Sequence, residues 1–254
     1  MDNTRSRLIV GNWKMHGSIA FVENFSTELL KLALGIKAIN IELVLCPPNP
    51  YLKIICDIFD STTIFVGGQD CHADMSGAYT GDVSAEMLVD VGCKYVITGH
   101  SERREQHGEH NSLVRRKTTA AQTGGLIPIL CVGEKAEDRE RGAAVETILR
   151  QLKECVPEGS RGRDIVVAYE PVWAIGTGKI PKISEIAEVH GAIRDAVNKL
   201  VSDPDALRIL YGGSVKPENA QDILSVSNVD GALVGGASLK TDEFWRIVKA
   251  YHKE

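Results

Sequence analysis

The chain has 254 residues, of which 43% are hydrophobic and 25% are charged, a composition typical of a globular protein with a large core. Its formal net charge of -5 excludes the basic surface with which nucleic-acid-binding proteins hold phosphates, so we expect no nucleic-acid partner. The N-terminus lacks the apolar segment of an export signal, and no apolar run is long enough to span a bilayer. We therefore expect a cytoplasmic protein with no membrane partner.

The first half of the chain alternates apolar strands with segments of helical spacing. In chain order it predicts a strand at 7–12, a helix at 21–34, a strand at 41–46, a short helix at 51–59, a strand at 63–67, a helix at 84–91, a strand at 94–98 and a helix at 112–123. The strand at 41–46 stops at two prolines, which cannot donate to a sheet. A polar loop with glycines fills positions 70–82.

The second half continues the same alternation. It predicts a strand at 126–132, a helix at 143–155, a strand at 165–169, a helix at 184–201, a strand at 207–211, a short helix at 218–224, a strand at 229–234 and a helix at 242–252. Strands separated by helices pair in parallel, because parallel neighbours need long crossovers. Since no linker or change of composition marks a boundary, we predict one α/β domain over residues 1–254, a single (β/α)8 barrel. A doubly wound open sheet is the weaker alternative.

Several local features are expected to be structural. The six cysteines lack C-x-x-C spacing and are expected to be reduced thiols, with Cys131 in the core. The basic residues at 103–104 and 115–117 are expected on solvent-exposed helix faces. Segment 107–110 has two histidines with a spacing that could hold a metal, but its glycine and charges favour a solvent-exposed turn, so we expect no metal site.

The segment from Asp164 to Lys179 is the one around which the rest of the chain is organised. A continuous apolar run ends at Glu170, and Pro171 then stops the strand. A carboxylate at the tip of a buried strand is expected to have a raised pKa. The apolar and glycine-bearing segment 172–178 that follows is typical of a lid that closes over a catalytic base. A strand-end glutamate with an ordinary loop is the alternative.

Unusual residues follow five of the predicted strands. They are Asn12 and Lys14, His100 and Glu102, Glu170, Gly212 to Ser214, and Gly235 to Ser238. In a parallel barrel all of these ends lie at one face, where active sites are built. Chance polar residues would account for one such end but poorly for all of them.

These motifs identify a resemblance. Gly-Asn-Trp-Lys at 11–14, Gly-His-Ser-Glu-Arg-Arg at 99–104, Ala-Tyr-Glu-Pro-Val-Trp-Ala-Ile-Gly-Thr-Gly-Lys at 168–179, Tyr-Gly-Gly-Ser-Val at 211–215 and Leu-Val-Gly-Gly-Ala-Ser-Leu at 233–239 closely resemble the triosephosphate isomerases, in that family's order. The resemblance implies a cofactor-independent, homodimeric enzyme of glycolysis and gluconeogenesis. Its reaction would interconvert dihydroxyacetone phosphate and D-glyceraldehyde 3-phosphate through an enediolate.

The resemblance also implies catalytic roles. Glu170 would move a proton between neighbouring carbons, and His100 would donate a hydrogen bond to the enediolate oxygens while shuttling protons between them. The helix start after His100 is expected to help keep the imidazole uncharged. Lys14 would be a fixed cation and Asn12 a neutral donor at the substrate oxygens. Glu102 is expected to pair with Lys14 or with a neighbouring arginine, in a structural or a catalytic role.

The resemblance also implies a set of phosphate-binding groups and a loop that forms a dimer. Backbone N–H groups at Gly176, Ser214, Gly235 and Gly236 would hold the substrate phosphate, together with the side chains of Asn12 and Lys14. The loop at 75–82 resembles the family's dimer loop, with Thr80 reaching the partner's active site. Asp82 stands where the family more often has Glu, so its carboxylate has a shorter reach.

Two other functions remain open at this point. A Schiff-base aldolase on the same barrel would use Lys14 as its nucleophile, and borohydride would then trap the lysine with substrate. A non-catalytic phosphate-binding protein would bind the ligand without turnover.

Overall fold

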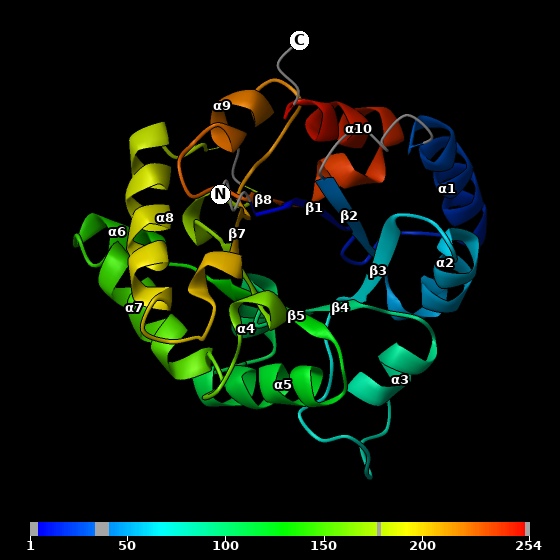
Figure 1. The fold of residues 1–254 in the computed structure, drawn as a ribbon, viewed down its shortest axis with the longest axis horizontal. Coiled ribbons are helices and arrows are strands. Elements are labelled where there is room, and N and C mark those ends of the chain that lie inside the picture. The colour runs from blue at the N-terminus through cyan, green and yellow to red at the C-terminus, as the bar shows by residue number, and fades with distance from the viewer. Residues whose placement is uncertain (1–4, 34–40, 177–178, 252–254) are drawn as a thin grey trace.

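The computed structural model describes residues 5–33, 41–176 and 179–251, and these residues form a closed barrel of eight parallel strands surrounded by helices (Figure 1). The strands are β1 (Arg7–Asn12), β2 (Ile41–Cys46), β3 (Ile64–Gly68), β4 (Tyr95–Thr98), β5 (Ile127–Val132), β6 (Val166–Tyr169), β7 (Arg208–Tyr211) and β8 (Gly231–Val234). Each strand pairs with the next, and β8 closes on β1 with Leu8 opposite Gly231. The predicted barrel is therefore confirmed, and the open-sheet alternative is wrong.

Helices fill the connections between strands. They are α1 (Ile19–Ala33), α2 (Leu52–Phe59), α3 (Ala85–Asp90), α4 (Ser101–Gln106), α5 (Asn111–Thr123), α6 (Ala136–Glu140), α7 (Ala144–Cys155), α8 (Ile183–Val197), α9 (Ala220–Leu224) and α10 (Thr241–Lys249). The helical spacing did not reveal α4 and α6, because each is a short run of mostly polar residues without an apolar stripe. The helix start expected after His100 is the start of α4. The predicted end of the last helix, at residue 252, lies outside the described residues.

The strands read as continuous apolar runs because both of their faces are buried. Leu8 and Val10 of β1 point into the barrel, where they pack with Val44 of β2, whereas Ile9 between them packs toward the surrounding helices. Cys131 belongs to the barrel interior, as expected of a core thiol. None of the described helices has both the length and the apolar composition needed to cross a membrane.

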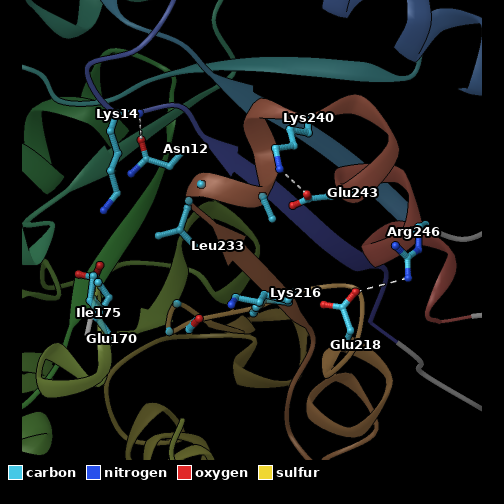
Figure 2. Close-up of a pocket in the computed structure, with 18 of the residues that line it drawn as sticks. Asn12, Lys14, Glu170, Ile175, Lys216, Glu218, Leu233, Lys240, Glu243 and Arg246 are labelled. Atoms are coloured by element: carbon cyan, nitrogen blue, oxygen red, sulfur yellow. Dashed lines mark hydrogen bonds and ion pairs between the residues drawn. The ribbon is translucent and has the colours of Figure 1, made fainter. Parts of the chain in front are cut away.

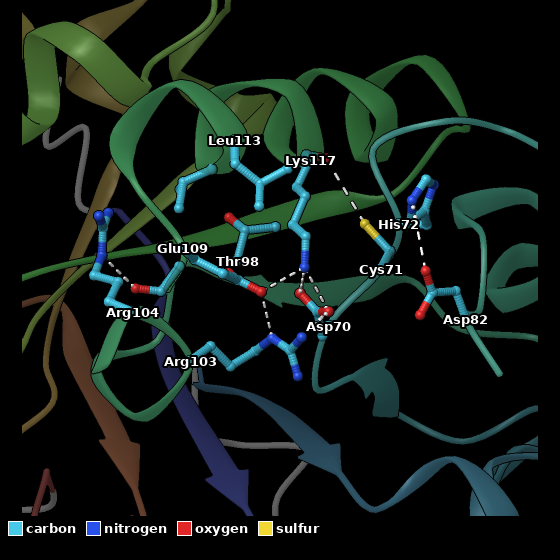
Figure 3. A network of polar contacts seen from close by, with 12 residues as sticks. Asp70, Cys71, His72, Asp82, Thr98, Arg103, Arg104, Glu109, Leu113 and Lys117 are labelled. Atoms are coloured by element: carbon cyan, nitrogen blue, oxygen red, sulfur yellow. Dashed lines mark hydrogen bonds and ion pairs between the residues drawn. The ribbon is translucent and has the colours of Figure 1, made fainter. Parts of the chain in front are cut away.

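A buried charge cluster on the outside of β3 and β4 corrects two expectations (Figure 3). Glu109 and Lys117, expected on a turn and on an exposed helix face, are each 4% exposed. Lys117 Nζ lies 2.6 Å from Glu109 Oε1 and 2.7 Å from Asp70 Oδ2. Arg103 bridges the same two carboxylates, with Nε 2.7 Å from Glu109 and Nη2 3.0 Å from Asp70. Within segment 107–110 only Glu109 turns inward, since His107, Gly108 and His110 are exposed as expected of a turn. His110 accepts the backbone N–H of Leu113 at the start of α5.

Candidate active site

The C-terminal ends of the strands surround a cavity of about 680 Å³ (Figure 2). Its wall includes residues that the sequence pointed to: Asn12, Lys14, His100, Glu170, Gly176, Gly212, Gly213, Ser214, Gly235 and Gly236. Glu102 stands behind this wall, bonded to Lys14. Residues from five strand ends therefore share one site, as parallel pairing requires.

Glu170 lies directly after β6 and is 2% exposed. Its Oε2 accepts the backbone N–H of Ser101 at 2.9 Å, and its Oε1 lies 2.9 Å from Nε2 of His100. Both partners stand at the end of β4, so the carboxylate is held against a neighbouring part of the cavity wall.

The pKa of Glu170 corrects a prediction. Burial raises this pKa, as expected, but His100, the Ser101 N–H and Lys14 together outweigh burial and lower the pKa below its usual value. Glu170 is therefore a carboxylate at neutral pH, the form that can accept a proton. The sequence showed the burial but not the partners that offset it.

His100 begins α4, and its imidazole is buried between two carboxylates. Its Nδ1 accepts the backbone N–H of Glu102 at 3.3 Å, so the neutral imidazole carries its proton on Nε2, facing Glu170. Burial favours this neutral form, but Glu170 and then Glu102 stabilise the imidazolium, and the pKa of His100 is raised. The helix start was expected to help keep His100 uncharged, but in the arrangement in which His100 pairs with Glu170 the carboxylates favour the charged form.

Lys14 is fixed by its backbone and by an ion pair. Its φ of 51° is unusual for a residue with a side chain, and strain of this kind is common at functional sites. Asn12 Oδ1 accepts the Lys14 N–H at 3.0 Å, and Gln69 donates to the Lys14 carbonyl at 2.8 Å. Lys14 Nζ lies 2.5 Å from Oε1 of Glu102, so of the two expected partners for Glu102 the structure has Lys14.

The opposite wall of the cavity offers backbone donors. In the described part of the chain, the N–H groups of Gly213, Ser214, Gly235 and Gly236 donate to no backbone carbonyl. A Cβ added at Gly236 would meet no atom within 4 Å, so packing inside the chain does not require glycine there. A glycine there leaves the backbone open to close approach by a ligand. Such converging N–H groups can bind an anion.

The predicted lid is described only in part. Val172–Ala174 forms a short 3₁₀ helix, Ile175 and Gly176 line the cavity, and residues 177–178 lie outside the described residues. The indole of Trp173 donates to Oε1 of Glu134 at 2.8 Å. The start of this segment is thus tied to the end of β5.

Glu134 is a residue that the sequence analysis missed. It is fully buried, and its Oε1 also accepts from Arg139 at 2.7 Å and from Tyr169 at 3.2 Å. Its position in the sequence could have identified it, because Glu134 comes shortly after β5 just as Glu170 comes directly after β6. Glu134 is thus a polar residue at a sixth strand end, next to the start of the lid segment.

Gly133 controls where the backbone of Glu170 lies, because a Cβ added at Gly133 would fall 1.8 Å from the Glu170 carbonyl oxygen. Gly133→Ala must therefore push β5 and β6 apart, and we expect it to destabilise the protein by about 1–3 kcal/mol. It should also lower kcat by about tenfold or more by displacing the carboxylate. Urea unfolding and turnover measure the two effects. Gly191→Ala is the control, since a Cβ at that helical position meets nothing within 4 Å, and equal behaviour of the two variants would contradict the prediction.

Thr80 and Asp82 do not line the cavity of their own chain. Both are exposed on the loop before α3, and Asp82 Oδ2 lies 3.5 Å from Nε2 of His72. They are predicted to contact a second copy of the chain at a dimer interface, and that prediction does not require them to line the cavity of their own chain.

Comparison with known proteins agrees with this geometry. The family model for triosephosphate isomerase matches residues 7–251. The chain is 47% identical over 251 residues to a triosephosphate isomerase of Xanthobacter flavus, covering 98% of this chain and 99% of that one. It is 50% identical over 245 residues to that of Ruegeria sp. (strain TM1040), covering 96% and 97%. A crystal structure of triosephosphate isomerase from Bartonella henselae superposes with a TM-score of 0.89 at 40% identity, covering 98% of this chain and all of that one. The chain belongs to the triosephosphate isomerase family.

Proposed function

We propose that this chain interconverts dihydroxyacetone phosphate and D-glyceraldehyde 3-phosphate, with the whole chain acting as one catalytic domain. The observation that carries the proposal is the position of the Glu170 carboxylate, which faces His100 and shares a cavity with Lys14 and the free N–H groups. A base, an electrophile and an anion site are the three parts that this isomerisation needs.

The reaction begins when Glu170 leaves Ser101 and His100 and takes a proton from the carbon next to the substrate carbonyl. Leaving also removes the main charge that stabilises the His100 imidazolium, so the neutral imidazole with its proton on Nε2 becomes favoured. That N–H then donates to the enediolate oxygen, and the ammonium group of Lys14 stabilises the same negative charge. The imidazole of His100 passes the hydroxyl proton from one enediolate oxygen to the other, and Glu170 returns the carbon-bound proton to the neighbouring carbon, so that both proton transfers of the isomerisation are complete.

Phosphate binding and closure support these steps. The N–H groups of Ser214, Gly235 and Gly236 would hold the phosphate, with Asn12 and Lys14 near the reacting end. The lid segment that begins at Trp173 would close over the ligand, because water near the enediolate would favour loss of phosphate. Gly176 would then add its N–H to the phosphate site.

The test is a coupled assay of D-glyceraldehyde 3-phosphate conversion with no metal or cofactor added. We expect fast turnover that Glu170→Gln abolishes, since an amide cannot accept the proton. Borohydride trapping of Lys14 with substrate would instead indicate a Schiff-base aldolase. Binding of a triose phosphate analogue without turnover would indicate a receptor.

We also propose that the protein is a cytoplasmic homodimer, assembled through the loop that carries Thr80. Large apolar side chains are exposed around this loop: Met15 is 93% exposed, Tyr79 44% and Met87 55%. Met15 follows Lys14, and the Lys14 carbonyl accepts a hydrogen bond from Gln69, which precedes the loop in the sequence. Met87 lies on α3, which follows the loop directly. Exposed apolar side chains near one loop favour a protein partner there.

Thr80→Arg is expected to disrupt this dimer, because it puts a long charged side chain into the proposed contact. Analytical ultracentrifugation should show a shift from dimer to monomer. Ser225→Arg, at an exposed serine next to α9, is the control and should leave the sedimentation coefficient unchanged. A dimeric Thr80→Arg variant would count against the loop as the interface.

A further inference from the structure

The cavity extends beyond the proposed phosphate site to an outer rim that carries Lys216. This residue lies two positions after Ser214, in the connection between β7 and α9, and its side chain lines the same cavity. In Figure 2 the ammonium group of Lys216 points away from Glu218, toward the side of the view where Glu170 and Ile175 lie.

The other cations of the cavity are neutralised by carboxylates. Lys14 Nζ is 2.5 Å from Glu102. Lys240 Nζ is 2.7 Å from Glu243, and Arg246 Nη2 is 3.5 Å from Glu218. These are the pairs expected where opposite charges line one cavity.

Lys216 differs from them. Among the residues that the structure describes, no carboxylate lies within ion-pair distance of its ammonium group. The proposed phosphate site consists mainly of N–H dipoles, and these do not balance the two negative charges of a phosphate monoester. Lys216 is therefore a cation without a carboxylate partner on the side where the dianion is expected. Asp242 also lines the cavity and forms no ion pair with the described residues, but it lies in the segment of Lys240.

We propose that Lys216 is a further phosphate-binding residue, which attracts the substrate dianion into the cavity and holds it there by charge. The proposal rests on the isomerase function for the identity of the ligand, but it concerns binding and not proton transfer. Lys216 would contribute to kcat/KM through KM, and its contribution would fall as salt screens the attraction.

The experiment compares Lys216→Gln with Lys240→Gln, two lysines of one cavity that differ in having a carboxylate partner. The probe is inorganic phosphate, titrated calorimetrically at low ionic strength, so the measurement does not depend on turnover. Removing a charge next to a dianion should weaken binding by about fivefold in Lys216→Gln. Lys240→Gln should weaken it by less than about twofold, and Lys216→Arg should restore it.

A kinetic measurement separates this role from a structural one. In the coupled assay, Lys216→Gln should raise KM for D-glyceraldehyde 3-phosphate by a similar factor with kcat unchanged, and the difference from the unmodified protein should shrink as salt is added. Its slow turnover of D-glyceraldehyde, which has no phosphate, should equal that of the unmodified protein.

Unchanged phosphate binding in Lys216→Gln would overturn the proposal, and so would an equal loss in Lys240→Gln, which would indicate a general effect of charge. A loss of D-glyceraldehyde turnover would overturn it by showing a disturbed site. If the unmodified protein did not turn over triose phosphate, the isomerase proposal would fail, while the phosphate titration would still decide the role of Lys216.

Discussion

Glu170→Asp is expected to lower kcat by about 100-fold or more while the fold and phosphate binding are kept, because an error of about 1 Å in the position of a catalytic group can have an effect of this size. The backbone of Glu170 cannot follow the shorter side chain, since its N–H donates to the Val132 carbonyl at 2.8 Å. On the other side, a Cβ at Gly212 would lie only 3.0 Å from Glu170 Cγ, so the strand ends are already close. The carboxylate of the aspartate would therefore lie farther from the substrate carbon than the carboxylate of Glu170 does.

Steady-state kinetics in both directions of the reaction measure this loss, and calorimetric titration with inorganic phosphate measures binding. Glu170→Gln is the lower reference, because it keeps the size of the side chain and removes the base. Glu146→Asp, at an exposed position of α7, is the matched control and should keep full activity. Retained full activity in Glu170→Asp would remove Glu170 from the mechanism.

The barrel could be predicted from the sequence because buried parallel strands have a strong local pattern. Each of the eight strands is a short apolar run, and the crossovers are long enough for helices. The helix α4 could not be predicted in this way, since Ser101 to Gln106 has almost no apolar side chain. Its position is set by the end of β4 and by His100, which caps it.

The residues of the site could also be predicted, but their protonation could not. Strand-end positions and family motifs brought Glu170, His100 and Lys14 to one cavity. The pKa directions depend on which groups come within about 3 Å of each other, and the sequence does not give such distances. Burial alone predicts a raised pKa for Glu170, whereas the Ser101 N–H and His100, which follow another strand, reverse the direction.

The charges around α5 were misread for a related reason. Lys117 looked like a residue of a solvent-exposed helix because its neighbours in the sequence are basic. Its partners come from two other segments, the end of β3 with Asp70 and the turn with Glu109. A buried ion cluster formed from separate segments leaves no periodic pattern in the sequence.

Lys117→Met is accordingly expected to lower the free energy of unfolding by about 3–5 kcal/mol, because it leaves the buried carboxylate of Glu109 without its closest cation. Glu109 and Lys117 side chains are 2% and 5% exposed, so water cannot replace the lost partner. Burial raises the pKa of Glu109, but Lys117 and Arg103 outweigh it and lower that pKa. A carboxyl group with a lowered pKa stabilises the fold above its unfolded pKa, and this contribution is lost as the pH falls through the folded value. The loss caused by Lys117→Met should therefore be large at neutral pH and smaller in acid.

The neighbouring residue provides a matched control for this prediction. Arg116 is also ion-paired, with Nη2 2.8 Å from Asp74, but its side chain is 60% exposed. Arg116→Met should therefore change stability little, since water solvates the aspartate that remains. Urea unfolding of the single variants and of Lys117→Met with Glu109→Gln separates the contributions, because neutralising the carboxylate should recover part of the loss. If Lys117→Met were no more destabilising than Arg116→Met, the cluster would behave as a surface ion pair, and burial would not be what makes Lys117 important.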